Sequence, residues 1–342
     1  MAKRIGERTI MLENKPKIMS SAATVGKTEG EGPLGSDFDE IVEDALLGKE
    51  NWEQAESELQ NRTVRKALEK AKIKKADVDM IFAGDLLNQC VASSFGIKDF
   101  SIPFFGLYGA CSTITLSLSA ASVFVDCSAA DIAVAETSSH FCSAEKQFRY
   151  PLEYGSQRPP TAQRTATACG AIVLKKDCAS KVFIKYITPG KIMDLGIKDA
   201  NNMGAAMAPA AADTIASFLR DTNTRPDDYD LILTGDLGEV GTKLLYEILN
   251  KEHDIDVSSV HNDCGLMIYD RENQDVHSGG SGCGCCASVL SCHIIPKMER
   301  GELKKVLVAA TGALMSTISA NEGETIPSIS HAVLLCREDD NG

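Results

Sequence analysis

The sequence lacks any run rich in lysine and arginine, and acidic residues outnumber basic residues along the chain. Its 342 residues include 35 Lys and Arg against 48 Asp and Glu, which gives a formal net charge of −13 at pH 7. Nucleic acids and anionic lipid surfaces attract basic patches, so this charge balance disfavours direct binding to either. We therefore expect no nucleic acid among the partners of this protein.

The N-terminal segment lacks the apolar core of a secretory signal, although its first residues are basic. The chain nevertheless holds 12 cysteines, which is a large number for its length. Without a secretion signal, free thiols in a reducing compartment are expected in place of a disulfide framework. These two features predict a cytoplasmic protein.

Charged residues are absent between Asp99 and Asp126, a length that superficially matches a membrane span. The segment contains Pro103, Gly106 and Gly109 together with many Ser and Thr. This composition favours a strand, a tight turn and a buried helix over a membrane helix. A helix without charge over about four turns must be covered by protein on all sides.

Two short patterns occur once in each half of the chain. Residues 77–86 (DVDMIFAGDL) and 228–237 (DYDLILTGDL) read as apolar strands that end in Gly-Asp, and each follows an amphipathic helical segment. The aspartates that end them, Asp85 and Asp236, can cap the following segments or approach a pocket, and capping is the favoured role. Residues 130–139 and 304–313 form a second pair, and each follows an uncharged segment that opens in a glycine-rich turn. Apolar strands that alternate with helices are typical of parallel βαβ units.

Two uncharged helices, one from each half, are best buried against each other between two sheets. We therefore predict an α/β protein with a duplicated five-layer α/β/α/β/α fold and two buried central helices. The first half spans residues 1–180 and includes an inserted segment at about residues 140–165, and the second half spans residues 181–342. A constant offset between the halves places Cys111 opposite Cys285. Two unrelated α/β domains with similar strands are the alternative.

Cys111 follows a strand and a Gly-x-x-Gly turn and opens a predicted buried helix. The field of a helix N-terminus and its free N–H groups favour a thiolate at this position. The same N–H groups can hold an oxyanion or a carboxylate. A small buried cysteine that fills tight space is the alternative, and the sequence alone favours neither reading.

The sequence Gly-Ala-Cys-Ser at residues 109–112, in a duplicated α/β frame, resembles the thiolase superfamily. The resemblance implies that Cys111 stands where those enzymes carry their acyl-accepting nucleophile. Condensing members also carry a His, and an Asn or second His, in the second half. Here those positions read Gly235 or Asp236, and Ser281 or its neighbour. Each missing donor costs roughly 10²–10³ in rate, so the resemblance points to a binding protein and away from a condensing enzyme.

Several uncommon runs resemble the stage V sporulation protein AD family over nearly the whole chain. They are GPLGS at 32–36, AGDLLNQ at 83–89, QFRYP at 147–151, MGAAMAPAA at 203–211 and DCGLMIY at 263–269. This family of spore-forming bacteria has the thiolase fold. The resemblance implies a non-catalytic protein that binds dipicolinic acid (pyridine-2,6-dicarboxylate) and serves its uptake into the developing spore. It also implies integral membrane proteins of the SpoVA complex as partners, and a location in the cytoplasm, peripheral to the spore inner membrane.

A dipicolinate site needs apolar faces and hydrogen-bond donors, and it needs no nucleophile. The thioethers of Met193 and Met203 can pack against the ring, although methionine is as often a core filler. Lys198 can pair with one carboxylate, the N–H groups at Cys111 can take the other, and the C-terminal strand brings His331 near the pocket. A solvated lysine and a buried structural histidine are the alternatives. The predicted ligand-binding residues are Cys111, Met193, Asp194, Lys198, Met203 and His331.

The sequence predicts no resident cofactor or metal, although Ca²⁺ can arrive chelated by the ligand. The cysteines at 283–292 and His293 suggest zinc, but their spacing matches no standard zinc site. Thiolase relatives usually dimerise through the first half, and by that analogy we expect a homodimer. Two alternative functions stay open: an acyl-transferring or condensing enzyme that uses Cys111, and a structural scaffold with a vestigial pocket.

Overall fold

The computed structural model describes residues 2–148 and 158–338. The chain folds into two halves that arrange their strands in the same way. The order is β6-β5-β7-β9-β3 in the first half-sheet and β12-β11-β14-β15-β10 in the second. Every strand of one series has a counterpart at the same place in the other, so the predicted duplicated α/β fold is confirmed.

The strands follow the chain in two series. The first half-sheet consists of β3 (Lys17–Gly26), β4 (Glu40–Val42), β5 (Met80–Gly84), β6 (Phe104–Gly106), β7 (Ile132–Ser139) and β9 (Ala168–Lys175). The second consists of β10 (Val182–Thr188), β11 (Leu231–Thr234), β12 (His261–Asp263), β14 (Lys305–Ala313) and β15 (Ser328–Arg337). An N-terminal hairpin, β1 (Lys3–Ile5) and β2 (Thr9–Met11), extends the second half-sheet through β10, and β8 (Arg164–Thr165) pairs separately with β13 (Gly280–Ser281).

Parallel pairing joins three strands in the centre of each half, and it also joins β3 to β4 and β8 to β13. β5 pairs in parallel with β6 and β7, and β11 pairs in parallel with β12 and β14. The strands β9 and β15 run antiparallel to both of their neighbours. The parallel units predicted from the repeated strands are therefore confirmed, and β9 and β15 add antiparallel strands that need no crossover helix on the sheet.

The two half-sheets touch at one edge. The single register pair between β3 and β10 joins Lys17 to Phe183, so the strands form one continuous sheet at that point. Elsewhere the half-sheets diverge and enclose helices. We predicted two separate sheets, and the structure differs by this one edge contact.

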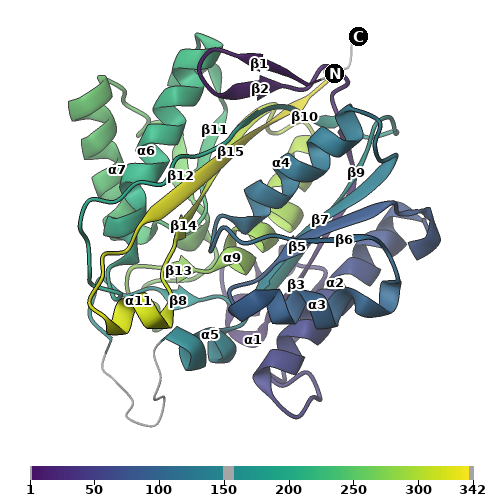
Figure 1. Ribbon diagram of the computed structural model, residues 1–342, viewed down its shortest axis with the longest axis horizontal. Helices are drawn as coiled ribbons and strands as arrows, with labels where there is room; N and C mark the ends of the chain where they lie inside the picture. Colours follow the sequence, from purple (N-terminus) through teal and green to yellow (C-terminus); the bar gives the residue numbers. More distant parts are fainter. Residues whose placement is uncertain (1, 149–157, 339–342) are drawn as a thin grey trace.

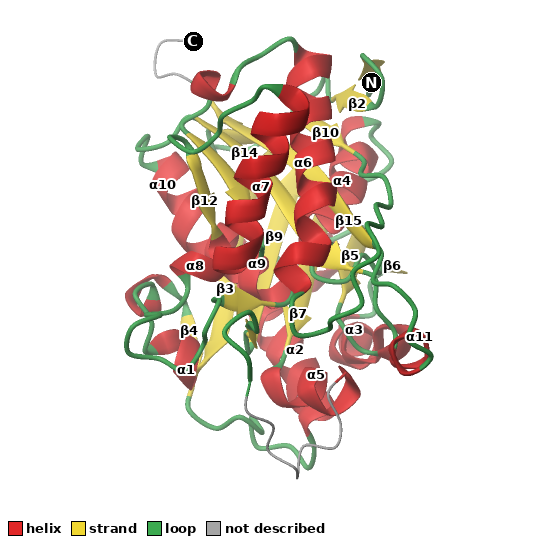
Figure 2. Ribbon diagram, turned by 90° about the vertical axis from the view of Figure 1, so that its left-hand side faces the viewer, coloured by secondary structure: helices red, strands yellow, loops and turns green. Residues whose placement is uncertain are grey.

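The helices form the remaining three layers (Figures 1 and 2). Figure 1 shows α6 and α7 on one outer side, α2 and α3 on the other, and α4 and α9 between the half-sheets. The five-layer arrangement predicted from the sequence is therefore confirmed. The helices are α1 (Lys27–Gly30), α2 (Trp52–Ala71), α3 (Val91–Ile97), α4 (Thr113–Asp126), α5 (Phe141–Phe148), α6 (Met203–Thr222), α7 (Gly238–His253), α8 (Cys264–Met267), α9 (Cys283–Val289), α10 (Ile295–Glu299) and α11 (Thr317–Asn321).

The central helix α4 contacts strands of both half-sheets, namely β5 and β7 on one side and β14 and β15 on the other. Two of its serine hydroxyls are satisfied within the helix, since Ser119 donates to the Thr115 carbonyl at 2.6 Å and Ser122 to the Leu118 carbonyl at 2.5 Å. Such back-bonding lets serine occupy a buried helix without an unpaired donor. The uncharged segment is thus a buried helix, as predicted. Among the residues that the structure describes, no helix is both long and apolar enough to span a bilayer.

The predicted boundary near residue 180 falls between β9 and β10. The predicted insertion at 140–165 opens with α5 and closes at β8, and residues 149–157 of it, including Arg149, lie outside the described residues. All twelve cysteines lie within the described part of the chain and all are free thiols, as expected.

Glycine is required where α9 meets the first half-sheet. A Cβ on Gly284 would overlap the carbonyl oxygen of Ala168, and a Cβ on Gly170 would overlap the carbonyl of Ala287. These are backbone atoms of packed elements, which cannot move aside as the end of a flexible side chain can. The central layer therefore depends on backbone-to-backbone contact.

We expect Gly284→Ala to lower the free energy of unfolding by about 1–3 kcal/mol or more, because the added methyl group overpacks the contact between α9 and β9. Urea denaturation of the purified protein measures this change. Gly106→Ala is the control, since its Cβ would make only ordinary contact with Phe104, and it should change stability by about 0.5 kcal/mol or less. Equal stability of the two variants would contradict the close approach of α9.

Candidate ligand-binding pocket

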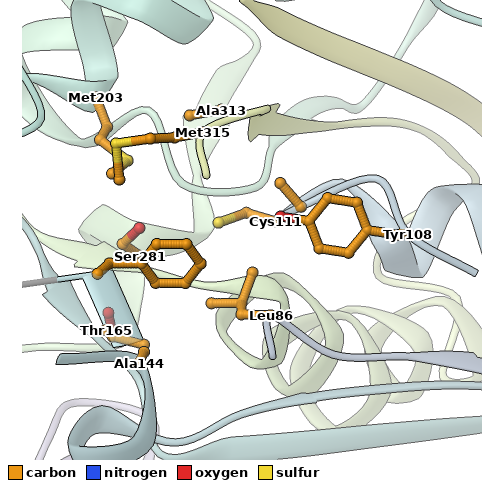
Figure 3. A pocket seen from close by; sticks show the side chains of 11 residues that line it. Leu86, Tyr108, Cys111, Ala144, Thr165, Met203, Ser281, Ala313 and Met315 are labelled. Atoms are coloured by element: carbon orange, nitrogen blue, oxygen red, sulfur yellow. The ribbon is translucent and has the colours of Figure 1, made fainter. Parts of the chain in front are cut away.

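A narrow chamber of about 40 Å³ lies where β5 and β11 end and α4 and α9 begin. Figure 3 shows Cys111 and Ser281 facing this chamber, with Met203 and Met315 on one side and Leu86 on the other. A wider outer cavity of about 290 Å³ shares three lining side chains with it. The shared residues are Tyr108, Phe148 and Met315. The two cavities therefore form one site with an inner and an outer part.

A tight turn sets the position of Cys111 at the start of α4. Ala110 has φ +48°, a left-handed conformation that a residue with a Cβ adopts at some cost. The turn is fixed by hydroxyl groups: Ser112 donates to the Gly109 carbonyl at 2.7 Å and Thr113 to the Ala110 carbonyl at 2.6 Å. The resulting geometry leaves Cys111 only 6% exposed at the inner end of the chamber.

The thiol of Cys111 lies against the carboxylate of Asp236, which accepts a hydrogen bond from it. Burial and the charge of Asp236 raise the pKa of the Cys111 thiol well above its ordinary value. Of the two readings that the sequence left open for this cysteine, the raised pKa favours the protonated buried thiol. Removal from water and a facing carboxylate outweigh the field of the helix, and the sulfur carries its proton at neutral pH.

Asp236 is a functional residue whose role in the structure differs from the role predicted for it. Its carboxylate accepts from the Thr311 hydroxyl at 2.8 Å, the Ser281 hydroxyl at 3.1 Å and the Gly282 N–H at 3.1 Å. Burial raises its pKa to about 6 against the opposing effect of these hydrogen bonds. We favoured a capping role for it, but Asp263 caps the chain here, since it accepts from the N–H groups that follow Asp236.

Asp85 ends the equivalent strand of the first half and behaves as predicted. Its carboxylate accepts from the backbone N–H of Leu87 at 2.8 Å and from the N–H and hydroxyl of Ser93 at 2.8 and 2.6 Å. It therefore caps the segments that follow β5. The repeated Gly-Asp signature identified both carboxylates but did not distinguish their roles.

Ser281 occupies the position equivalent to Cys111. Each residue precedes the first residue of a central helix by two positions, because α4 begins at Thr113 and α9 begins at Cys283. The predicted pairing of Cys111 with Cys285 is therefore wrong, and Cys285 is fully buried in the core within α9. The repeats do not keep a constant offset through the glycine-rich turn.

Only two of the six predicted ligand-binding residues line the inner chamber: Cys111 and Met203. Met193 and Asp194 lie instead in an exposed segment beside residues 325–328, where Met193 forms a β-bridge to Ser328. Asp194 accepts from the Thr325 hydroxyl at 2.5 Å and from the N–H of Gly196 at 2.9 Å.

Lys198 belongs to the same segment, and its side chain is exposed to solvent. His331 lies on β15 opposite Ala310, and its Nδ1 accepts from the N–H of Gly190 at 3.1 Å. Burial lowers the pKa of His331 to about 4, so the ring is neutral at physiological pH. Among the described residues, neither side chain lines the inner or the outer cavity.

The apolar walls were missed because no sequence pattern marks them. They come from loops and element ends that are distant along the chain: Leu86 after β5, Tyr108 before α4, Phe148 at the end of α5 and Met315 after β14. Tyr108 is 45% exposed, which places an aromatic ring at the opening of the site. The sequence predicts that these loops lie close together only through the repeated strands, because the ends of those strands meet at one edge of the sheets.

The cysteines of the second turn point in different directions. The Cys283 thiol donates to the Ser138 carbonyl at 2.9 Å, and the Cys292 thiol donates to Asp39 at 3.0 Å. His293 is held by Asp37 at 2.6 Å. Within residues 2–148 and 158–338 no group of three His, Cys, Asp or Glu residues is arranged to hold a metal ion.

The family model for stage V sporulation protein AD (SpoVAD) matches residues 6–336 of this sequence. The chain belongs to the stage V sporulation protein AD family. A member from Bacillus subtilis (strain 168), named stage V sporulation protein AD, is 45% identical over 335 residues. The match covers 98% of this chain and 98% of that protein, so the family resemblance stated from the sequence motifs is confirmed.

Solved structures of condensing enzymes share the fold of this family member. A variant of OleA from Xanthomonas campestris aligns with a TM-score of 0.60 over 95% of this chain and 99% of that chain, at 12% identity. The 3-oxoacyl-[acyl-carrier-protein] synthase III of Aquifex aeolicus VF5 aligns with a TM-score of 0.56 over 94% and 99% of the two chains, at 13% identity. At this level of identity the likeness establishes the thiolase-like fold alone.

We expect Asp236→Asn to speed the alkylation of Cys111 by iodoacetamide at pH 8. The amide removes the facing negative charge, and the reactive thiolate fraction rises about tenfold for each unit by which the thiol pKa falls. Mass spectrometry of peptides after timed alkylation measures the rate at each cysteine. The exposed Cys127 is the internal control. If Cys111 reacts at the same rate in both proteins, Asp236 does not control its ionisation.

Proposed function

We propose that this protein binds dipicolinic acid, without catalysis, in the pocket around Cys111 and Asp236, and that it serves dipicolinate uptake into the developing spore. Membership of the stage V sporulation protein AD family supports a role in sporulation. The observation that carries the proposal is the chemistry of the pocket, which combines apolar and aromatic walls with a polar floor of thiol and hydroxyl groups. A flat aromatic ligand with polar substituents requires such a combination.

The inner chamber is narrow, so the ligand ring must extend toward the outer cavity. In our proposal the ring lies between Tyr108 and Phe148 on one side and the thioethers of Met203 and Met315 on the other. Aromatic rings and methionine sulfur both make favourable contacts with an aromatic ligand. One carboxylate then reaches the floor formed by Cys111 and its neighbours, and the other carboxylate faces the outer cavity.

The absence of catalytic partners supports binding over chemistry. The positions that carry a His and an Asn or second His in condensing thiolases hold Gly235 or Asp236, and Ser281 or its neighbour, here. The Asp236 carboxylate keeps the Cys111 thiol protonated, whereas a nucleophile must lose that proton. A base that is itself hydrogen-bonded to four groups has little capacity to activate the sulfur.

The remaining parts of the proposal concern partners. We propose that the protein works at the cytoplasmic side of the spore inner membrane with integral membrane proteins of the SpoVA complex, and that Ca²⁺ arrives only as the chelate of the ligand. We also propose a homodimer through the first half. The edge strand β6 supports this, since its Phe104 and Phe105 are 37% and 42% exposed.

Titration of the purified protein with dipicolinate by calorimetry should give saturable heat. Tyr108→Ala should weaken binding about tenfold, because loss of one stacked aromatic ring costs about 0.5–1.5 kcal/mol beyond its buried area. Phe95→Ala, which removes an exposed ring on α3 away from the pocket, should leave the affinity unchanged. Absence of saturable heat at millimolar dipicolinate would refute the proposed function.

An acyl-transferring enzyme is the second candidate, because the chain shares the fold of condensing enzymes and places a cysteine at the start of a central helix. That function predicts a stable acyl adduct on Cys111 after incubation with an acyl-CoA, detected as a mass increase on its peptide. Our proposal predicts no adduct, with Cys111→Ser as the control that excludes modification elsewhere. A structural scaffold, the third candidate, predicts that pocket substitutions leave spore dipicolinate unchanged.

A further inference from the structure

Asp236 is hydrogen-bonded to the two polar side chains, Cys111 and Ser281, that form the floor of the chamber. Its carboxylate accepts from the Cys111 thiol and from the Ser281 hydroxyl, and both of these residues line the inner chamber. The other two donors, the Thr311 hydroxyl and the Gly282 N–H, belong to the supporting structure. Asp236 itself is fully buried and does not line the chamber.

Each of the two floor residues has one proton to donate. A thiol carries a single S–H and a hydroxyl a single O–H, and both are committed to the Asp236 carboxylate. Tyr108 and Thr165 also bring hydroxyl groups to the chamber lining, but the floor itself presents only the lone pairs of the Cys111 sulfur and the Ser281 oxygen. Such a floor accepts hydrogen bonds, so it repels a ligand carboxylate, which also only accepts them.

The surroundings of Asp236 do not compensate for its charge. The titratable groups that face it are Asp263 from β12, Cys283 and Cys285 from α9, and Cys111 before α4. None of these groups is a cation, and the described residues that line the two cavities include no Lys, Arg or His. An anionic ligand therefore meets an uncompensated carboxylate directly beneath the floor.

We propose that Asp236 is a positioning residue that sets the hydrogen-bonding polarity of the pocket through its own proton. As a carboxylate it holds the protons of Cys111 and Ser281 away from the ligand. When it takes up one proton from solution, these two groups are released and donate to a carboxylate of the ligand. No covalent bond to the ligand forms or breaks, and release of the ligand returns the proton to solution.

Asp236 can take up a proton at the pH of a cell. Burial raises the pKa of Asp236 to about 6, and a ligand that accepts hydrogen bonds from the floor favours the protonated form further. The new O–H of Asp236 can donate to the Ser281 oxygen, whose proton then turns to the ligand. This inference rests on the proposed function only in the identity of the ligand.

Calorimetric titration with dipicolinate between pH 5 and pH 8 tests the proposal. The affinity of the unmodified protein should fall by up to tenfold per pH unit above about pH 6, because one proton is taken up with each ligand. Titrations at one pH in two buffers with different ionisation heats count that proton directly. Carboxylic acids of ordinary acidity titrate near pH 4, so the ligand itself does not produce this slope.

Two variants identify the group that takes up the proton. Asp236→Asn should bind with an affinity that is independent of pH and with no proton uptake. Thr311→Val removes a donor that stabilises the carboxylate without touching the chamber, so the fall in affinity should begin at a higher pH. Asp85→Asn, at the equivalent strand end of the first half, should keep the pH profile of the unmodified protein.

The outcomes separate this inference from the proposed function. Dipicolinate binding with a flat pH profile in the unmodified protein overturns the inference and leaves the proposed function intact. A slope that persists in Asp236→Asn, or a Thr311→Val profile that does not move, overturns it as well. No binding at pH 5 overturns both.

Discussion

The structure depends on the need to cover two uncharged helices on every side. The central helix α4 has no charge before Asp126, and α9 has none at all, so neither can face water. Two half-sheets supply the cover, and glycine at 170 and 284 lets backbone meet backbone. Because both helices begin at the same edge of the sheets, the loops that precede them converge, and the pocket forms where they meet.

The sequence predicts the fold well because the fold follows from patterns that can be read along the chain. The repeated Gly-Asp strands and the uncharged helices are sufficient to derive the layers and the duplication. The antiparallel direction of β9 and β15 was not predicted, since a fully buried strand has the same apolar pattern in either direction. The register of the second repeat was also misjudged, because turns of different length precede α4 and α9.

The site was less predictable than the fold. Cys111 was found because a turn and a helix start have recognisable sequences, and Met203 because a thioether suits an aromatic ligand. The walls of Tyr108, Phe148 and Met315 are brought together by three loops that share no pattern. His331 was placed near the pocket by analogy, but its ring points to the backbone of Gly190. Burial and the charge of Asp236 set the ionisation of Cys111, and neither can be read from spacing.

A thiolase-like fold does not in itself require a reaction. The start of α4 presents a protonated thiol, because Asp236 faces it from the turn that follows β11. One carboxylate at a strand end is thus enough to change the chemistry of the pocket without changing a backbone contact. Ser281 occupies the position in the second half that Cys111 occupies in the first, so the duplication places a hydroxyl group beside the thiol.

The order of strands also constrains how the protein is made. In the second half-sheet β15, which ends at Arg337, lies between β14 and β10, so this half cannot close until β15 has left the ribosome. In the first half-sheet β9 fills the equivalent gap and ends at Lys175, so that sheet can close while synthesis continues. The helix α9, which covers part of the inner face of this sheet, is synthesised more than a hundred residues after β9. Until then the nascent chain exposes the part of this face that α9 covers in the folded protein, whereas α4 can already cover β5 and β7.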